Sequence, residues 1–241
     1  MLVIPAIDLK DGQAVRLFKG DYNQTTVYSD HPEELAQTFE KAGAIYLHVV
    51  DLDGAKDGFA KNLETIKKIR NSTKMKIELG GGIRDLKTVQ LYLDKVGIDR
   101  VILGTAALKD PEFLKEALRQ YGSEKIVVGV DVKNGFVSTA GWLETSRMPY
   151  IEFIQYLESI GVGYIVATDI SKDGTLTGPN FEMYDEIAKN SQIQFVVSGG
   201  IKDFDNIQKV AQKDYYACIV GKAYYEKKID LKETIKCLQN V

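Results

Sequence analysis

The feature that most constrains this fold is an internal repeat: one aspartate setting occurs twice, once in each half of the chain. Asp8 closes the apolar run Val3–Ile7 and Asp131 closes Ile126–Val130, and each has Lys two residues later and Gly four residues later. The two aspartates are 123 residues apart in a chain of 241 residues. Apolar, β-branched runs are typical of buried strands, so both carboxyl groups are expected at strand ends. The repeat predicts two fused half-units that direct a pair of carboxyl groups at one substrate.

Further pairs at nearly constant offsets support the duplication. Asp51 and Asp169 follow apolar runs and precede a Lys-Asp-Gly tripeptide, and a Gly-Gly-Ile triplet followed by a basic residue and Asp also occurs twice. The offset is 118 residues for the aspartates and the Gly-Gly-Ile triplets, 116 for the tripeptides and 117 for a later glycine after the next apolar run. The pairs are Asp51 with Asp169, Gly81 with Gly199, Gly82 with Gly200 and Gly104 with Gly221. We predict half-units of about residues 1–122 and 123–241 within one domain.

Composition places the chain among ordinary globular proteins. It is 44% hydrophobic and 27% charged with a net charge of −3, and its Lys and Arg residues are interspersed with acids. That pattern argues against a nucleic-acid partner. Its two cysteines give no disulfide framework, and neither a signal segment nor an apolar stretch of about 18 residues is present. We therefore expect a cytoplasmic, monomeric protein with no membrane or nucleic-acid partner.

Short apolar runs alternate with helical segments eight times. The runs lack polar alternation, as expected for a parallel sheet that is buried on both faces. The expected strands are Val3–Asp8, Ile45–Asp51, Lys76–Leu79, Arg100–Leu103, Ile126–Asp131, Tyr164–Asp169, Gln194–Ser198 and Ala217–Val220, with two short β excursions at Gly12–Phe18 and Gly135–Ser138. Asp or Pro near helix starts and Gly after helix ends punctuate the segments between them. We predict an α/β fold, a single (β/α)8 TIM barrel of two duplicated half-barrels; an open doubly wound sheet is the alternative.

Barrel geometry turns these positions into a candidate site. Functional groups of such barrels lie at the carboxyl ends of the strands, and the first and fifth strands stand opposite each other. Asp8 and Asp131 are therefore candidate catalytic residues that face each other across the mouth. Asp51 and Asp169 lie at the same edge, where acids often bond loop N–H groups instead. Thr168 and Asp169 are adjacent on one strand, so only one of them can face into the barrel.

Glycine pairs in each half predict two phosphate sites. Such loops let backbone N–H groups close on a phosphate because no Cβ blocks the approach. Tight turns use the same residues, but the pattern occurs twice, which predicts a small-molecule substrate with two phosphate groups. The candidate binding residues are Gly81, Gly82, Arg84, Gly104 and Thr105 in the first half, and Asp169, Gly174, Gly199, Gly200, Gly221 and Lys222 in the second.

Four other residues are candidates for substrate contact. Trp142, the only tryptophan, follows the fifth strand and could stack on a planar ring or pack against its own loop. His48 shares strand parity with Val50 and could face the site or be a satisfied interior histidine. Arg16 and Gly20 lie on the first loop, where they could reach a phosphate or be exposed to solvent.

These motifs resemble those of one family, the ProFAR isomerases of histidine biosynthesis (phosphoribosylformimino-aminoimidazole-carboxamide ribotide isomerases). The resemblance covers essentially the whole chain. Its most specific segments are Pro5–Leu9, Val15–Leu17, His48–Leu52, Gly80–Arg84, Gly141-Trp142, Thr168–Ile170 and Lys172–Thr175. The family is a half-barrel duplication whose substrate carries two phosphates, in agreement with the repeat and the glycine pairs.

The resemblance implies an isomerase that carries out an Amadori rearrangement, from the aminoaldose ProFAR to the aminoketose PRFAR. By the family's pattern Asp8 is the general base and Asp131 the general acid. The hydroxyl of Thr168 is a candidate to bond a carboxyl group or the ring oxygens. Asp131 would open the ribose ring to a Schiff base, and Asp8 would take the proton from C2. No metal and no organic cofactor is implied, because the protonated imine is the electron sink. The scheme requires a raised pKa at Asp131.

Three alternatives stay open. The sister imidazole-glycerol-phosphate cyclase shares both aspartates, but it needs a glutaminase partner, and the first loop Val15–Gly20 is similar to that of the isomerase. A bifunctional isomerase that also acts on phosphoribosylanthranilate tends to have Arg before the Gly-Trp pair, where this chain has Ala140. A non-catalytic phosphosugar-binding barrel would not need the carboxyl groups of Asp8 and Asp131.

Overall fold

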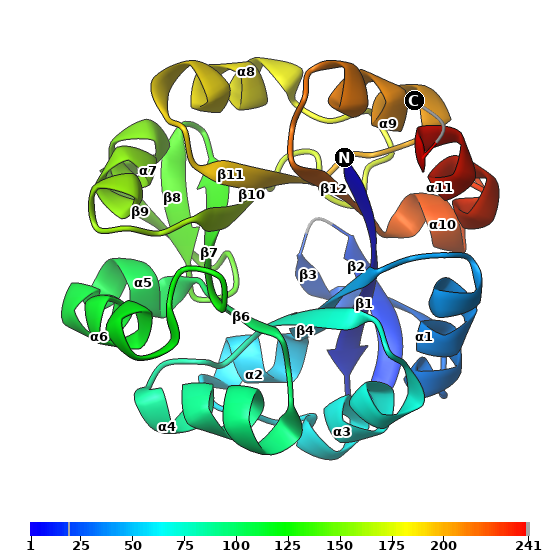
Figure 1. Ribbon diagram of the computed structural model, residues 1–241, viewed down its shortest axis with the longest axis horizontal. Helices are drawn as coiled ribbons and strands as arrows, with labels where there is room; N and C mark the ends of the chain where they lie inside the picture. Colours follow the sequence, from blue (N-terminus) through cyan, green and yellow to red (C-terminus); the bar gives the residue numbers. More distant parts are fainter. Residues whose placement is uncertain (19, 240–241) are drawn as a thin grey trace.

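Eight parallel strands close into a barrel that is surrounded by helices (Figure 1). The computed structural model describes residues 1–18 and 20–239. In ring order the strands are β1 (Leu2–Lys10), β4 (Tyr46–Asp51), β5 (Lys76–Gly80), β6 (Arg100–Leu103), β7 (Ile126–Lys133), β10 (Tyr164–Asp169), β11 (Gln194–Ser198) and β12 (Ala217–Val220), and β12 pairs with β1 to close the ring. The predicted (β/α)8 barrel is confirmed, with every expected strand within two residues of its observed bounds.

Helices follow the strands and pack on the outside of the barrel. The side chains of Asp110 and Asp203 each accept a hydrogen bond from the backbone N–H three residues later, which caps the first turn. The helices are α1 (Pro32–Lys41), α2 (Leu52–Asp57), α3 (Leu63–Ser72), α4 (Leu86–Gln90) with a π-helical turn (Leu91–Val96), α5 (Thr105–Lys109), α6 (Pro111–Tyr121), α7 (Tyr150–Ser159), α8 (Phe181–Asn190), α9 (Phe204–Gln212), α10 (Lys222–Tyr225) and α11 (Leu231–Gln239). None of the helices within the described residues is long and apolar enough to cross a membrane.

Strand parity divides the core into two parts. Side chains that point outward from the barrel, such as Leu47 and Leu79, join one large cluster with the buried faces of the helices. Side chains that point inward form a smaller cluster that fills the barrel, and it includes Ile4, Ile102 and Val127. Both faces of each strand are therefore buried, which accounts for the apolar runs in the sequence. The inward residues at the carboxyl ends of the strands are left to form a site.

Two hairpins extend the loops after β1 and β7. The first consists of β2 (Gln13–Phe18) and β3 (Asp21–Ser29), and the second of β8 (Phe136–Thr139) and β9 (Glu144–Pro149). The two predicted β excursions are confirmed as β2 and β8. Neither β3 nor β9 was expected, because both strands are polar and largely exposed and lack the apolar run that marks a buried strand.

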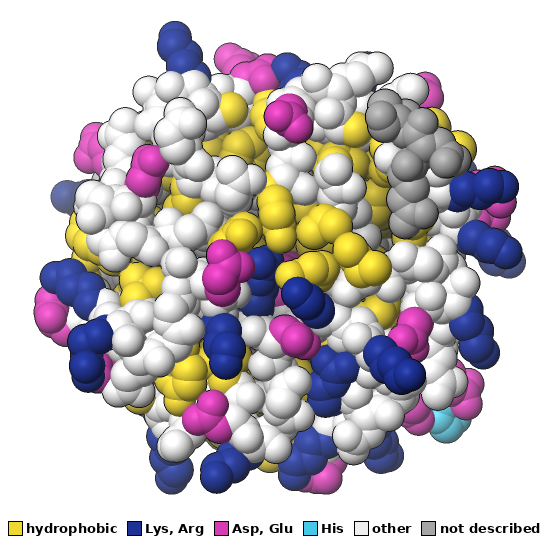
Figure 2. Space-filling view, viewed as in Figure 1, with side chains coloured by type: hydrophobic (Ala, Val, Ile, Leu, Met, Phe, Trp, Pro, Cys, Tyr) yellow, Lys and Arg dark blue, Asp and Glu magenta, His cyan; other side chains and the backbone are white. Residues whose placement is uncertain are grey.

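The face of the molecule seen in Figure 1 carries both signs of charge. Lys and Arg side chains alternate with Asp and Glu around its rim, and hydrophobic side chains gather nearer its centre (Figure 2). No block of one sign dominates this face, in keeping with the interspersed acids and bases of the sequence.

Candidate active site

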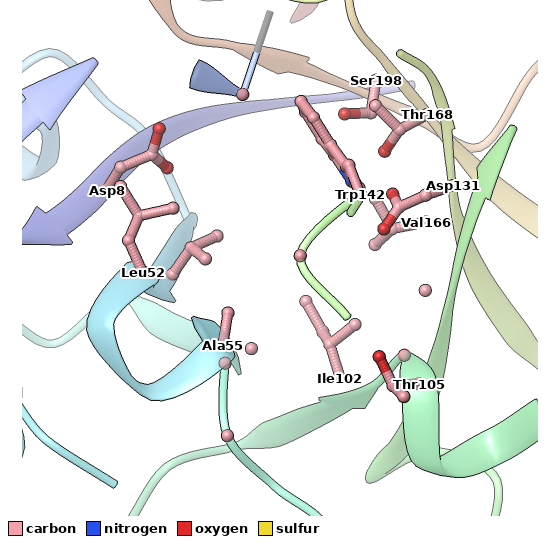
Figure 3. Close-up of a pocket in the computed structure, with 18 of the residues that line it drawn as sticks. Asp8, Leu52, Ala55, Ile102, Thr105, Asp131, Trp142, Val166, Thr168 and Ser198 are labelled. Atoms are coloured by element: carbon pink, nitrogen blue, oxygen red, sulfur yellow. The ribbon is translucent and has the colours of Figure 1, made fainter. Parts of the chain in front are cut away.

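An open cavity at the carboxyl ends of the strands contains both candidate catalytic aspartates. Its empty volume, which includes the open mouth, is about 1290 Å³. Asp8 from β1 and Asp131 from β7 line it, and these strands are four positions apart in a ring of eight. The two carboxyl groups accordingly lie on opposite sides of the cavity (Figure 3). The structure thus brings together the pair that the repeat predicted.

Asp8 is held in an ion pair by the hairpin that follows it. β2 runs antiparallel to β1, which places Arg16 beside the strand end. Nη1 of Arg16 is 2.7 Å from Oδ2 of Asp8, and Nη2 donates to the carbonyl oxygen of Ala6 at 2.9 Å. The two side chains are only 14% and 16% exposed. This charge-assisted hydrogen bond presents Asp8 to the cavity as an oriented carboxylate.

Asp131 has a different environment. Removal from solvent raises the pKa of its carboxyl group, while hydrogen bonding from Trp142 and Thr168 and the nearby His48 lower that pKa in part. Figure 3 shows the indole of Trp142 and the hydroxyl of Thr168 next to this carboxyl group. A raised pKa favours the protonated form of Asp131. The two aspartates therefore face one cavity in different settings, one in an ion pair and one removed from solvent.

A third carboxyl group, Asp173, also lines the cavity and was not a predicted site residue. Burial raises the pKa of Asp173 to about 6; Arg16 opposes that rise, and the charges of Asp8 and Asp131 add to it. The signals for this residue were the repeated Lys-Asp-Gly tripeptide and the segment Lys172–Thr175 of the family resemblance. Its counterpart in the first half, Asp57, is an exposed residue paired with Lys61 at 3.0 Å, so the motif alone does not distinguish a cavity residue from a surface one.

Asp51 and Asp169 anchor loops. Asp51 accepts hydrogen bonds from the backbone N–H groups of Gly54 at 2.8 Å and Asn62 at 3.0 Å. Asp169 accepts from Ser171 N at 2.8 Å and from the side chain of Asn180 at 2.7 Å. Thr168, the neighbour of Asp169, lines the cavity, whereas Asp169 does not. The structure does not bring the carboxyl group of Asp169 into the site, because adjacent strand residues point to opposite sides.

The first glycine loop forms one wall of the main cavity. Gly81 has φ +105°, and a Cβ there would overlap the backbone of Asp51, so only glycine allows this close approach. Oγ1 of Thr105 accepts a hydrogen bond from Ala140 N at 2.8 Å, which ties the loop after β6 to the second hairpin. The predicted residues that line this wall are Gly81, Gly82, Arg84, Gly104 and Thr105.

The second glycine loop forms a separate, smaller cavity with an empty volume of about 420 Å³. Arg16 and Asp173 line both cavities and so form the partition between them. A Cβ at Gly221 would overlap the guanidinium of Arg16, which shows how closely that charge approaches this loop. The predicted residues that line the smaller cavity are Gly174, Gly199, Gly200, Gly221 and Lys222.

The tips of the two hairpins meet over the main cavity. A Cβ at Gly20 would overlap the six-membered ring of Trp142, so the indole lies directly against the backbone of the first hairpin. Ala140, Gly141 and Trp142 have φ of +56°, +61° and +70°, a run of left-handed conformations that turns the indole inward. Gly20 and Trp142 both line the cavity. Their contact joins the first half of the chain to the second.

His48 lines the floor of the cavity, with its Nδ1 2.7 Å from Oε1 of the fully buried Glu78. His48 therefore lines the cavity and also has a buried hydrogen-bond partner, so the two alternatives for this residue hold together. Other lining residues were missing from the sequence predictions because nothing in their local pattern marks them; they include Tyr22, Thr139 and Ser198. Within residues 1–18 and 20–239, no three His, Cys, Asp or Glu side chains gather so that they could hold a metal ion.

Comparison with known proteins agrees with this geometry. Residues 2–230 match the model of a family described as "Histidine biosynthesis protein". One relative from Lactococcus lactis subsp. cremoris (strain SK11) is 60% identical over 233 residues, 97% of this chain and 95% of the relative. A relative from Campylobacter hominis is 53% identical over 234 residues (97% and 98%), and one from Clostridium acetobutylicum is 48% identical over 239 residues (99% of each). All three are named 1-(5-phosphoribosyl)-5-((5-phosphoribosylamino)methylideneamino) imidazole-4-carboxamide isomerase.

Proposed function

Because the chain belongs to the histidine biosynthesis protein family, we propose that it converts ProFAR, a bis-phosphate aminoaldose, to the aminoketose PRFAR. It is an isomerase of histidine biosynthesis, like the relatives that it matches along nearly their full length. The observation that carries the finer proposal is the pair of carboxyl groups, Asp8 and Asp131, on opposite strands of one cavity. The division into half-barrels of about residues 1–122 and 123–241 is part of the same proposal.

In this proposal Asp131 is the general acid. Its protonated carboxyl group donates to the ring oxygen of the aminated ribose, the C1–O bond breaks, and the nitrogen lone pair forms a protonated imine at C1. The raised pKa of Asp131 supports this role, because a larger share of the group is protonated near neutral pH than for an ordinary aspartate. Thr168, whose hydroxyl lies beside Asp131, would orient the carboxyl group or a sugar oxygen.

Asp8 is the general base in the second step. Its carboxylate takes the proton from C2, the electrons of the C2–H bond form a C1–C2 double bond, and the imine nitrogen becomes neutral. The resulting enolamine then tautomerises to the ketone at C2. The ion pair with Arg16 supports this role because it fixes the direction of the carboxyl group in the cavity.

The two glycine loops would bind the two phosphates. Arg84 lines the main cavity and Lys222 the smaller one, so each loop has a cation beside its backbone N–H groups. Arg16, in the partition, is near enough to the loop at Gly221 to add a third positive charge. A substrate with a phosphate at each end would span the partition with its sugar over Asp8 and Asp131.

A turnover assay with ProFAR tests the proposal, with phosphoribosylanthranilate as the alternative substrate. We expect conversion of ProFAR by the purified chain alone, without metal and without a glutaminase. Conversion of both substrates would establish the bifunctional reading instead. Binding of ProFAR without turnover would favour a non-catalytic phosphosugar-binding barrel.

A further inference from the structure

A row of three polar side chains crosses the interior of the barrel below the cavity. His48 on β4 is in register with Glu78 on β5, which is in register with Arg100 on β6. Nδ1 of His48 is 2.7 Å from Oε1 of Glu78. Glu78 is 0% exposed and Arg100 only 5% exposed. The row therefore holds a buried carboxyl group against an imidazole, while the guanidinium of Arg100, next in register, bonds to Glu124 and Tyr216.

The repeat supplies an apolar version of the same row. The residues that follow His48 and Glu78 by 118 positions, and Arg100 by 117, are Val166, Val196 and Ala217. They are in register with one another on β10, β11 and β12, and all three belong to the apolar cluster that fills the barrel. The same positions of the same scaffold are thus filled with aliphatic side chains in the second half.

This contrast indicates that the polar row has a role other than stability. Burial of a carboxylate is unfavourable, and replacement of buried ionic groups by aliphatic ones is often neutral or stabilising. Oε2 of Glu78 has no hydrogen-bond partner among the described residues, so the arrangement does not even satisfy the buried carboxyl group. Because the second half does without such a row, the fold itself does not require one.

The position of His48 indicates what that role is. His48 lines the cavity, whereas Glu78 lies behind it and does not. His48 lines the same cavity as Asp131 and Asp173, so the imidazole borders the carboxyl groups of the site. When Glu78 accepts a hydrogen bond from Nδ1–H of His48, the other ring nitrogen, Nε2, can bond to a group in the cavity. Buried partners of this kind are known to fix the tautomer and orientation of a functional histidine.

We propose that Glu78 is a positioning residue: it holds His48 by Nδ1–H so that Nε2 forms a hydrogen bond with an oxygen of the substrate sugar between Asp8 and Asp131. This inference rests on the proposed isomerase function and adds a residue to it. Glu78 itself does not touch the substrate. It acts only through the imidazole, so its removal should change the tautomer of His48 even when no substrate is present.

Nuclear magnetic resonance of ring-labelled histidine tests the positioning directly. The chain has two histidines, so each spectrum contains two ring systems, and the exposed His31 is an internal reference. We expect His48 in the Nδ1–H form in the natural protein and in Glu78→Gln, whose side-chain oxygen still accepts. Glu78→Val should move His48 to the Nε2–H form and leave His31 unchanged. An unaltered tautomer in folded Glu78→Val would overturn the proposal.

Steady-state kinetics test the consequence for catalysis. We expect Glu78→Val to lower kcat about ten- to a hundredfold, as misplacement of a functional group by about 1 Å does, and Glu78→Gln to stay within about threefold of the natural protein. The matched control is Val196→Ala, at the counterpart of Glu78: it removes interior packing without a polar contact, so kcat should not change. A natural kcat in Glu78→Val despite a switched tautomer would also overturn the proposal.

A double variant keeps the proposal testable if Glu78→Val alone does not fold. His48→Val with Glu78→Val copies the aliphatic pair of the second half, so it should fold with a melting temperature no lower than that of the natural protein. Its kcat should equal that of His48→Val alone, because Glu78 has no role without the imidazole; a further drop would contradict the proposal. If the natural protein does not convert ProFAR, the proposed function and the sugar contact fail together, whereas the spectra still decide whether Glu78 positions His48.

Discussion

Nη1 of Arg16 lies 2.7 Å from Oδ2 of Asp8, and this same guanidinium borders both cavities of the molecule. The first hairpin therefore orients a carboxyl group on the strand before it, because β2 brings the guanidinium of Arg16 to the end of β1. Asp131 has no such ion pair within residues 1–18 and 20–239, and its pKa is raised by removal from solvent. The two aspartates share a position in the repeat but differ in environment, and that difference leads to the first two predictions.

Asp8→Asn should abolish most of the turnover while it leaves the fold and ligand binding nearly intact. The amide cannot accept the C2 proton, so we expect kcat to fall by roughly 10²- to 10⁴-fold. The measurements are kcat with ProFAR and the calorimetric affinity for PRFAR. Asp11→Asn is the matched control, since Asp11 lies three residues away with a side chain that is 74% exposed, and its kcat should not change. Loss of folding or of affinity in Asp8→Asn would assign Asp8 to structure.

The turnover of the natural protein should decrease as the pH rises through the pKa of Asp131. This pKa is raised, so the acid form persists to a higher pH than for an ordinary aspartate and is then lost. A profile of kcat against pH records this limb. Asp131→Asn should lack it and should have a low kcat throughout. The assignment of Asp131 as the acid would fail if Asp131→Asn kept the natural profile.

Asp173→Asn should stabilise the protein at neutral pH and have no such effect in acid. The pKa of Asp173 is about 6 in the folded state, against the ordinary value of 3.8. The folded state thus binds this proton more tightly, so the stability that it contributes is complete below about pH 3.8 and is lost as the pH rises through 6. With allowance for partial exposure, we expect a gain of about 1–2 kcal/mol at pH 7. Urea unfolding at pH 4 and pH 7 measures the difference, and an equal effect at both would refute this titration.

Gly20→Ala should displace the indole of Trp142 and impair catalysis. The new Cβ would overlap the ring, so the contact between the hairpins must open. Trp142 is the only tryptophan, so its fluorescence reports the change: we expect emission at longer wavelength and a kcat that is lower by about tenfold, or about 1.4 kcal/mol. Gly97→Ala controls for backbone strain, because Gly97 has a similar φ of +80° but nothing within 4 Å of its Cβ position. Equal kinetic effects of both substitutions would mean that strain, not the indole, is responsible.

Arg84→Ala should weaken substrate binding more than it slows turnover. Arg84 lines the main cavity beside the first glycine loop, and a charged hydrogen bond is worth about 1.5–3 kcal/mol. We therefore expect KM for ProFAR to rise roughly ten- to a hundredfold, with kcat changed less. Lys202→Ala is the matched control, since Lys202 is the counterpart of Arg84 in the repeat but is an exposed partner of Asp203. An unchanged KM in Arg84→Ala would exclude a phosphate contact there.

Much of the fold could be predicted because buried parallel strands have a distinct pattern. Apolar runs such as Arg100–Leu103 and Gln194–Ser198 match β6 and β11 in both bounds. The polar strands β3 and β9 were missed because their stability comes from pairing in a hairpin, which leaves no apolar run in the sequence.

The site residues on strands could be predicted, because strand parity decides which side chains face the cavity. The site residues on loops could not, because their positions depend on how each loop packs against the rest of the fold. Parity indicated that either Thr168 or Asp169 faces the cavity, and the structure shows that it is Thr168. Asp173 was missed because its burial depends on how the loop after β10 lies against Arg16, whereas the matching tripeptide at Asp57 stays at the surface. Pairing between loops, as at Gly20 and Trp142, likewise has no local sequence signal.

The single polar row at His48, Glu78 and Arg100 has a consequence for how the barrel can be used. If its two halves were fully equivalent, a repeated scaffold would offer an elongated ligand two orientations, and a molecule with unlike ends would bind in either one equally often. The imidazole of His48 lies at the floor of the cavity in the first half of the barrel. The aliphatic side chains of Val166 and Val196, at the matching positions of the second half, cannot form its hydrogen bond, so the two orientations of the ligand differ. The three buried side chains of this row thus add to the other differences between the two sides that give the cavity a head and a tail.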